Sequence, residues 1–174
     1  MSSGQNQRNI VLIGFMGAGK STVGSRLARF LGYRLVDLDR LIVERAGCSI
    51  REIFARDGEA VFRAYEAAAL RALVGMRRIV VATGGGIVGR RENWLAMHQL
   101  GIIAYLRVPW EVLCERIAGD EKRPLADQRD GGERLRQLWE SRLPLYEQAD
   151  LIVECDRKSP EQIARWITAA LERA

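Results

Sequence analysis

One short stretch of the sequence has the residue pattern of a phosphate-binding loop. Residues 14 to 22 read GFMGAGKST, which fits glycine, four residues, and then Gly-Lys-Ser or Gly-Lys-Thr. Arginine supplies nearly all the positive charge elsewhere, because the 27 Lys and Arg residues include only three lysines, Lys20, Lys122 and Lys158. A lysine at position 20 therefore fits a specific need: its compact ammonium can reach the β- and γ-phosphates of a nucleotide.

The residues of this loop suggest distinct chemical roles. A glycine-rich turn lets successive backbone N–H groups point at phosphate oxygens, and the helix that follows adds partial positive charge at its start. The hydroxyl of Ser21 is suited to Mg²⁺. The alternative is a glycine turn without a ligand. We expect nucleotide contacts from Gly17, Ala18, Gly19, Lys20, Ser21 and Thr22.

Two carboxylates at the end of the next apolar run are candidates for metal binding and catalysis. Asp37 and Asp39 are two residues apart, and this spacing places both side chains on one face of a strand. One can hold Mg²⁺, directly or through water, while the other takes the hydroxyl of an acceptor. The alternative role for either residue alone is to cap the helix that follows.

Three consecutive glycines, Gly84, Gly85 and Gly86, follow a third apolar run. Ligands bind at the carboxyl ends of strands in open α/β sheets, and glycines let backbone N–H groups approach an anion or a hydroxyl closely. A simple tight turn is the alternative interpretation.

Five β-rich apolar runs alternate with segments of helical period, which predicts βαβ units and an α/β fold with a parallel sheet. Ser49-x-x-Glu52 is a capping box that predicts a helix start, and Gly32 is expected to end the helix that begins in the phosphate loop. The five runs are residues 9–13, 33–37, 78–82, 102–107 and 151–154.

Two side chains that often attract functional interpretations are assigned ordinary roles. Trp166 shares a helical spacing with Ile163 and Ile167, so we expect it to pack in the core. His98 is the single histidine of the chain and has no nucleophilic partner nearby in the sequence, so we do not expect it to be catalytic.

The 174 residues are enough for one well-buried core and too few for two ordinary domains. We expect a flexible segment at 1–9 and a single domain at 10–174. Within that domain, residues 119–132 (GDEKRPLADQRDGG) are charged and have glycine at both ends. Such a segment is typical of a mobile lid, and its Lys122-Arg123 pair suggests a lid over phosphates.

Composition limits the partners and the location of the protein. The formal charge is +5, but the arginines are spread along the chain without interleaved stacking aromatics, so we expect no nucleic-acid partner. No run approaches the about 18 apolar residues of a membrane span. The three cysteines form no CxxC pair, which argues against a disulfide framework or a zinc site and favours the cytoplasm. We also expect a monomer.

Further motifs along the chain are Phe62-Arg63-x-x-Glu66, Arg123-Pro124-Leu125, and Arg142 with Tyr146 and Ala149. Together with GFMGAGKSTVG, the DLD of 37–39 and Gly84–Gly86, and in their order along the chain, these motifs resemble those of the shikimate kinase family, from about residue 10 to 171. The resemblance implies a three-layer α/β/α P-loop kinase with a mobile lid and a five-stranded parallel sheet ordered 2-3-1-4-5. It also implies phosphorylation of the 3-hydroxyl of shikimate by ATP·Mg²⁺.

The resemblance implies a role for individual residues as well. Lys20, Asp39 and Arg123 would be catalytic, and Asp39 would also contact the substrate hydroxyls. Ala126 departs from the usual Arg-Pro-Leu-Leu of the family, so lid packing is expected to differ. The remaining assignments are Ser21 and Asp37 at the metal; Arg63 and Arg142 on the substrate carboxylate, with Gly84, Gly85 and Gly86 nearby; and Arg116, Arg157, Lys158 and Pro160 beside adenine.

Other functions remain open at this point. A gluconate or nucleotide kinase could use the same scaffold, although Asp39, Arg63 and Arg142 suit a polyhydroxylated carboxylate better than a nucleobase. A GTPase is disfavoured because the guanine-reading Asn/Thr-Lys-x-Asp sequence is absent. The non-enzyme alternative is an arginine-rich nucleic-acid-binding or ATP-dependent binding module.

Overall fold

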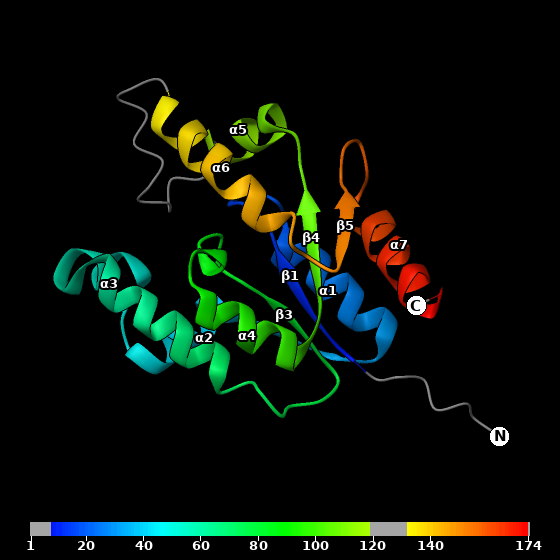
Figure 1. Ribbon diagram of the computed structural model, residues 1–174, viewed down its shortest axis with the longest axis horizontal. Coiled ribbons are helices and arrows are strands. Elements are labelled where there is room, and N and C mark those ends of the chain that lie inside the picture. The colour runs from blue at the N-terminus through cyan, green and yellow to red at the C-terminus, as the bar shows by residue number, and fades with distance from the viewer. Residues whose placement is uncertain (1–7, 119–131, 174) are drawn as a thin grey trace.

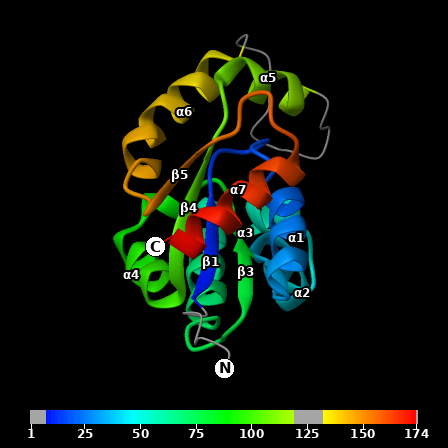
Figure 2. The same cartoon turned by 90° about the vertical axis from the view of Figure 1, so that its right-hand side faces the viewer.

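The computed structural model describes residues 8–118 and 132–173, which form a parallel sheet with helices on both faces (Figures 1 and 2). The sheet order is β2-β3-β1-β4-β5, and every pair of neighbouring strands is parallel. The predicted fold class and strand order are therefore confirmed. The strands are β1 (Asn9–Ile13), β2 (Arg34–Asp37), β3 (Ile79–Ala82), β4 (Gly101–Arg107) and β5 (Leu151–Glu154).

The central strands are apolar apart from Asn9, because both faces of the sheet are covered. Every residue of β1 and β3 is buried. Helices α1 (Lys20–Leu31) and α7 (Pro160–Arg173) lie side by side on one face. Helices α3 (Ile50–Arg71) and α4 (Arg91–Leu100) lie on the other (Figure 1). Among the described helices, none is long and apolar enough to span a membrane.

Three neighbouring strands end level with one another, which brings three predicted motifs to one edge of the sheet. In the register, Ala82 pairs with Asp37 on one side and with Leu12 on the other. The phosphate loop follows β1, the helix α2 (Leu38–Ala46) follows β2, and the glycine turn and the 3-10 helix η1 (Ile87–Gly89) follow β3. Helices α5 (Trp110–Ala118) and α6 (Glu133–Tyr146) lie beyond the same edge (Figure 1).

The predicted helix boundaries are confirmed at two places. Ser49 and Glu52 form a reciprocal capping box at the start of α3, and Gly32 ends α1 in the left-handed conformation. Helix α3 is kinked at Gly58, whose φ of 82° is non-helical.

The expectation for Trp166 was wrong. The residue is 41% exposed, whereas Ile163, Ala164 and Ile167 are the buried residues of α7. The buried stripe is centred toward Ala164, so Trp166 lies at its edge. Helical spacing identifies an apolar face without fixing its centre.

Candidate active site

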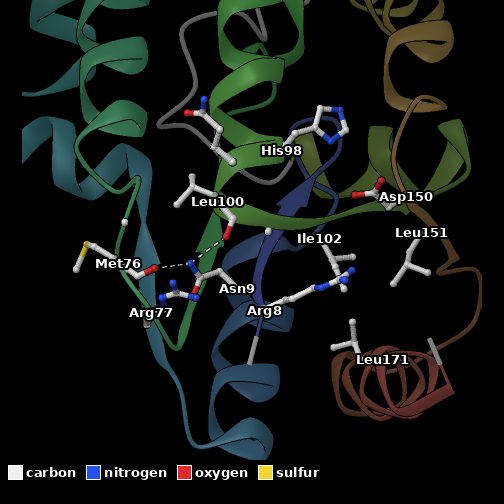
Figure 3. Close-up of a pocket in the computed structure, with 13 residues that line it drawn as sticks. Arg8, Asn9, Met76, Arg77, His98, Leu100, Ile102, Asp150, Leu151 and Leu171 are labelled. Carbon is white, nitrogen blue, oxygen red and sulfur yellow. Dashed lines mark hydrogen bonds between the residues drawn. The ribbon is translucent and has the colours of Figure 1, made fainter. Parts of the chain in front are cut away.

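Two hollows lie at opposite ends of the sheet. The one at the amino ends of the strands has a volume of about 650 Å³ and is lined by residues that include Arg8, His98 and Asp150 (Figure 3). Asn9 links two residues that line this hollow: its Nδ2 donates to Met76 O at 2.7 Å and to Leu100 O at 3.0 Å (Figure 3). This end gathers none of the predicted site residues, and His98 lies here, far from the phosphate loop.

The hollow at the carboxyl ends has a volume of about 460 Å³ and gathers most of the predicted site. Cations and carboxylates both line it, as a site for a polyphosphate and a polar acceptor requires. From the predicted set, its lining includes Gly17, Gly19, Lys20, Ser21, Thr22, Asp37, Asp39, Arg63, Gly84, Gly85, Gly86 and Arg142.

The phosphate loop runs between β1 and α1 and depends on glycine geometry. Gly17 and Gly19 have φ values of 80° and 85°, a region that favours glycine over residues with a side chain. Gly19 is the N-cap of α1, and within the described part of the chain no side chain caps this helix start. The first N–H groups of α1 are therefore suited to an anion.

Lys20 is buried and folds over its own loop. Its Nζ donates to Gly14 O at 2.7 Å and to Phe15 O at 2.9 Å. These carbonyls hold the ammonium beside the helix start, where a phosphate would meet it.

Ser21 and Asp37 meet at the edge of the loop. Ser21 Oγ donates to Asp37 Oδ2, and Asp37 Oδ1 accepts from the backbone N–H of Arg40 at 3.2 Å as the N-cap of α2. Asp37 therefore caps a helix with one oxygen and adjoins the phosphate-loop hydroxyl with the other. The two interpretations of this residue are compatible.

Asp39 and Glu66 converge on the first residue of the glycine turn. A Cβ atom at position 84 would lie 2.7 Å from Glu66 Oε1 and 3.1 Å from Asp39 Oδ1, so glycine leaves room for both carboxylates in their present positions. The expected reason for the placement of Asp39 was wrong. Strand β2 ends at Asp37, and Asp39 belongs to the first turn of α2.

Glu66 is a functional candidate for which no role was predicted from the sequence. Its side chain is fully buried, and none of the described residues donates a hydrogen bond to Oε1. Burial raises the pKa of Glu66, partly offset by Arg63, and the nearby Asp39 raises it further. The signal available in the sequence was its position three residues after Arg63, one helical turn away.

Arg63 is held from both sides. Its Nη1 donates to Glu66 Oε2 and its Nη2 to Glu59 Oε1, each at 3.0 Å. Burial alone would lower the pKa of Arg63, but Glu66 and Glu59 outweigh it and raise the pKa above its usual value. The guanidinium packs against Gly86, where a Cβ atom would lie 2.4 Å from Nη1.

Arg142 approaches the glycine turn from α6. Its Nη1 lies 3.4 Å from Gly85 O, and its Cζ lies 5.9 Å from the centroid of the Phe15 ring. The site thus receives one arginine from each side, Arg63 from α3 and Arg142 from α6. Two arginines suit bidentate recognition of a carboxylate.

The residues expected beside adenine do not line this hollow. Arg116 on α5 reaches the phosphate loop, since its Nη1 donates to Gly17 O at 3.0 Å. Arg157, Lys158 and Pro160 lie in the connection between β5 and α7 and at the start of that helix. Arg123 and residues 119–131 of the expected lid lie outside the described residues, so the geometry of the lid arginine stays a prediction.

A parallel sheet ordered 2-3-1-4-5, a phosphate loop after its central strand and an adjoining acceptor hollow define the protein as a P-loop kinase of small molecules. Comparison with known proteins identifies the family. The family model for shikimate kinase matches residues 16–172. The chain belongs to the shikimate kinase family.

Individual relatives agree with the family model. The chain is 47% identical to a shikimate kinase of Nostoc sp., covering 98% of this chain and 94% of that protein. It is 48% identical to a shikimate kinase of Geobacter sulfurreducens, covering 94% and 90%. A solved shikimate kinase from Acinetobacter baumannii, in complex with shikimate, has a TM-score of 0.92 and 35% identity, covering 97% of this chain and 95% of that chain.

Family membership makes the chain an ATP-dependent kinase and a transferase of the shikimate pathway, which leads to aromatic amino acids. It decides against a gluconate or nucleotide kinase on the same scaffold.

Proposed function

We propose that this protein transfers the γ-phosphoryl group of ATP to the 3-hydroxyl of shikimate, and that its 460 Å³ hollow holds both reacting groups. The observation that carries this proposal is the convergence of the phosphate loop, Asp39 and the Arg63–Arg142 pair on one hollow. The products are ADP and shikimate 3-phosphate.

The phosphate loop and Lys20 are assigned to ATP. The N–H groups at the start of α1 would bind phosphate oxygens, and Lys20 would exchange its two carbonyl partners for the β- and γ-phosphates. Arg116, which already contacts Gly17 O, would flank adenine together with Arg157, Lys158 and Pro160. Arg123 would stabilise the transferring phosphoryl group from the lid.

Ser21 and Asp37 are assigned to Mg²⁺. Their contact brings a hydroxyl and a carboxylate oxygen together beside the phosphate loop, and Mg²⁺ prefers such hard oxygen ligands. Few protein ligands are needed, because Mg²⁺ at kinase sites is also held by water and phosphates. When bound, the ion neutralises phosphate charge.

The other end of the hollow is assigned to shikimate. Arg63 and Arg142 would bind its carboxylate, and Gly84, Gly85 and Gly86 would approach it with backbone N–H groups. Glu66 keeps Arg63 oriented through Oε2, and its Oε1 faces the glycine turn, where a hydroxyl group can donate to it.

Asp39 is assigned to the acceptor hydroxyl. As the hydroxyl oxygen forms its bond to the γ-phosphorus, the bond from that phosphorus to the ADP oxygen breaks and the hydroxyl proton passes to the Asp39 carboxylate. If Asp39 only orients the hydroxyl, its removal should raise KM more than it lowers kcat.

The proposal also includes the oligomeric state, the location and the domain organisation of the enzyme. We propose that the enzyme acts as a monomer in the cytoplasm, with residues 10–174 as one kinase domain.

The function is tested by measuring ADP release from Mg²⁺·ATP in the presence of shikimate, gluconate or AMP. The proposal predicts that shikimate alone stimulates release. Stimulation by gluconate or AMP, or by none of the three, would contradict it. Nucleic acid serves as a further arm, because salt-sensitive retention on it without any substrate-stimulated ADP release would favour a binding module.

A further inference from the structure

Tyr146 forms a hydrogen bond with the backbone of the glycine turn. This residue ends α6, is fully buried, and donates from its hydroxyl to Gly85 O at 2.5 Å. Its ring stacks on Tyr105, with centroids 5.0 Å apart and planes at 16°. Burial raises the pKa of Tyr146, so the hydroxyl keeps its proton and remains a donor.

The bond to Gly85 O sets the direction of a backbone N–H group. Gly85 C=O and Gly86 N–H belong to one peptide group, and the described residues contain no cis peptide bond. In a trans peptide the C=O and the N–H point in opposite directions. Because Gly85 O faces Tyr146 and Arg142 on α6, the N–H of Gly86 points away from α6.

A peptide between two glycines needs such an anchor. Glycine reaches both signs of φ easily, so this peptide can rotate with little steric resistance. Rotation would place a carbonyl oxygen where the N–H had been, which would repel an anion. The turn also lies against the phosphate loop, since a Cβ atom at position 85 would lie 3.1 Å from Met16 N.

We propose that Tyr146 is a positioning residue for the acceptor substrate: by holding Gly85 O, it presents the Gly86 N–H to the carboxylate of shikimate and aligns the turn with Arg142. This proposal rests on the proposed function, because it deepens the assignment of the carboxylate end of the hollow. Tyr146 itself touches neither substrate.

Replacing Tyr146 with Phe removes only the hydroxyl and leaves the stacked ring. We expect Tyr146→Phe to raise the KM for shikimate about 3- to 10-fold, as for the loss of one neutral hydrogen bond. The kcat and the KM for ATP should stay within about twofold, because the phosphate loop and Asp39 are unchanged. Tyr105→Phe is the matched control: it removes the hydroxyl of the stacking partner, and every constant should stay within about twofold of wild type.

The methyl ester of shikimate separates positioning from general weakening. Because the ester carries no anionic carboxylate, its KM should differ little between wild type and Tyr146→Phe. The proposal is overturned if the shikimate KM of Tyr146→Phe matches wild type, or if shikimate and ester suffer equally. A parallel change of kcat and both KM values would show a merely structural role and overturn it as well.

A measurement on the wild-type protein is independent of how the variant folds. The amide NMR signal of Gly86 should shift on addition of shikimate and shift much less with the ester, and an unshifted signal would overturn the proposal. The two proposals fail in different ways. Wild-type enzyme that does not phosphorylate shikimate contradicts the proposed function, whereas active wild-type enzyme with an indifferent Tyr146→Phe variant contradicts this inference alone.

Discussion

Replacing Glu66 with Gln tests how the buried carboxylate serves Arg63. The variant keeps the size of the side chain and an oxygen that can accept from Arg63 Nη1, now 3.0 Å from Glu66 Oε2. It removes the negative charge, so a charge-assisted hydrogen bond becomes a neutral one. Arg63 keeps its second partner, Glu59.

The expected magnitude follows from this exchange. Hydrogen bonds to charged groups contribute about 1.5–3 kcal/mol and neutral ones about 0.5–1.5, a difference of roughly 1–1.5 kcal/mol. If this difference is the free energy lost from holding Arg63 in its binding position, the KM for shikimate should rise about 5- to 15-fold, since 1.4 kcal/mol corresponds to a tenfold change. The KM for ATP should change little, because Glu66 lies at the acceptor end of the hollow.

Although Glu66→Gln should weaken shikimate binding, it should make the folded protein more stable relative to wild type as the pH rises. Burial raises the pKa of Glu66 above its ordinary value of 4.5, so the folded protein binds this proton more tightly than the unfolded chain. The stabilisation from protonated Glu66 is fully present below the unfolded pKa and is lost as the pH rises through the folded pKa. Glu66→Gln has no such titration, so its free energy of unfolding should improve relative to wild type as the pH rises above 4.5.

Steady-state kinetics measure the change in the shikimate KM, and denaturant unfolding at a series of pH values above 4.5 measures the change in stability. Glu59→Gln is the matched control, because Glu59 also pairs with Arg63 but its side chain is 63% exposed. An exposed pair contributes about 0–1 kcal/mol, so the shikimate KM of this control should rise less than about fivefold. The reasoning is refuted if Glu66→Gln binds shikimate like wild type, or if it loses stability relative to wild type as the pH rises.

Three further substitutions separate the ends of the hollow. Lys20→Met should abolish phosphoryl transfer while thermal unfolding still shows a folded protein, and near-normal activity would remove the phosphate-loop assignment. Arg142→Lys should raise the shikimate KM markedly and leave ATP affinity nearly unchanged, because Lys cannot reproduce a bidentate fork; an unchanged KM would place this arginine elsewhere. Asp39→Asn should lower kcat by about 10²–10⁴, the range for a general acid–base group, and a wild-type kcat would exclude that role.

The sequence was sufficient where function depends on local motifs and strand ends. The phosphate loop, the capping box at Ser49 and the five strands are read from contiguous residues, and parallel strands bring their carboxyl ends together. That is why the sequence alone predicts that Lys20, Asp37 and Gly84 lie at one site.

The sequence was insufficient where packing decides. Tyr146 and Gly85 are 61 residues apart, and only the tertiary structure brings this hydroxyl to that carbonyl. The burial of Glu66, and hence its raised pKa, also depends on how α3 packs against the glycine turn. The prediction that Trp166 packs in the core was wrong for the same reason, because the spacing of apolar residues did not fix the centre of the buried face of α7.

Identification of the product tests most directly whether the protein transfers the γ-phosphoryl group of ATP to the 3-hydroxyl of shikimate, as proposed. Wild-type enzyme is incubated with Mg²⁺·ATP and shikimate, and the product is examined by ³¹P NMR. We predict one new phosphate monoester whose phosphorus couples to the proton at C3 of shikimate, formed in equal amount to ADP. Coupling to the proton at another ring carbon, or ADP formed together with inorganic phosphate and no ester, would contradict the assignment.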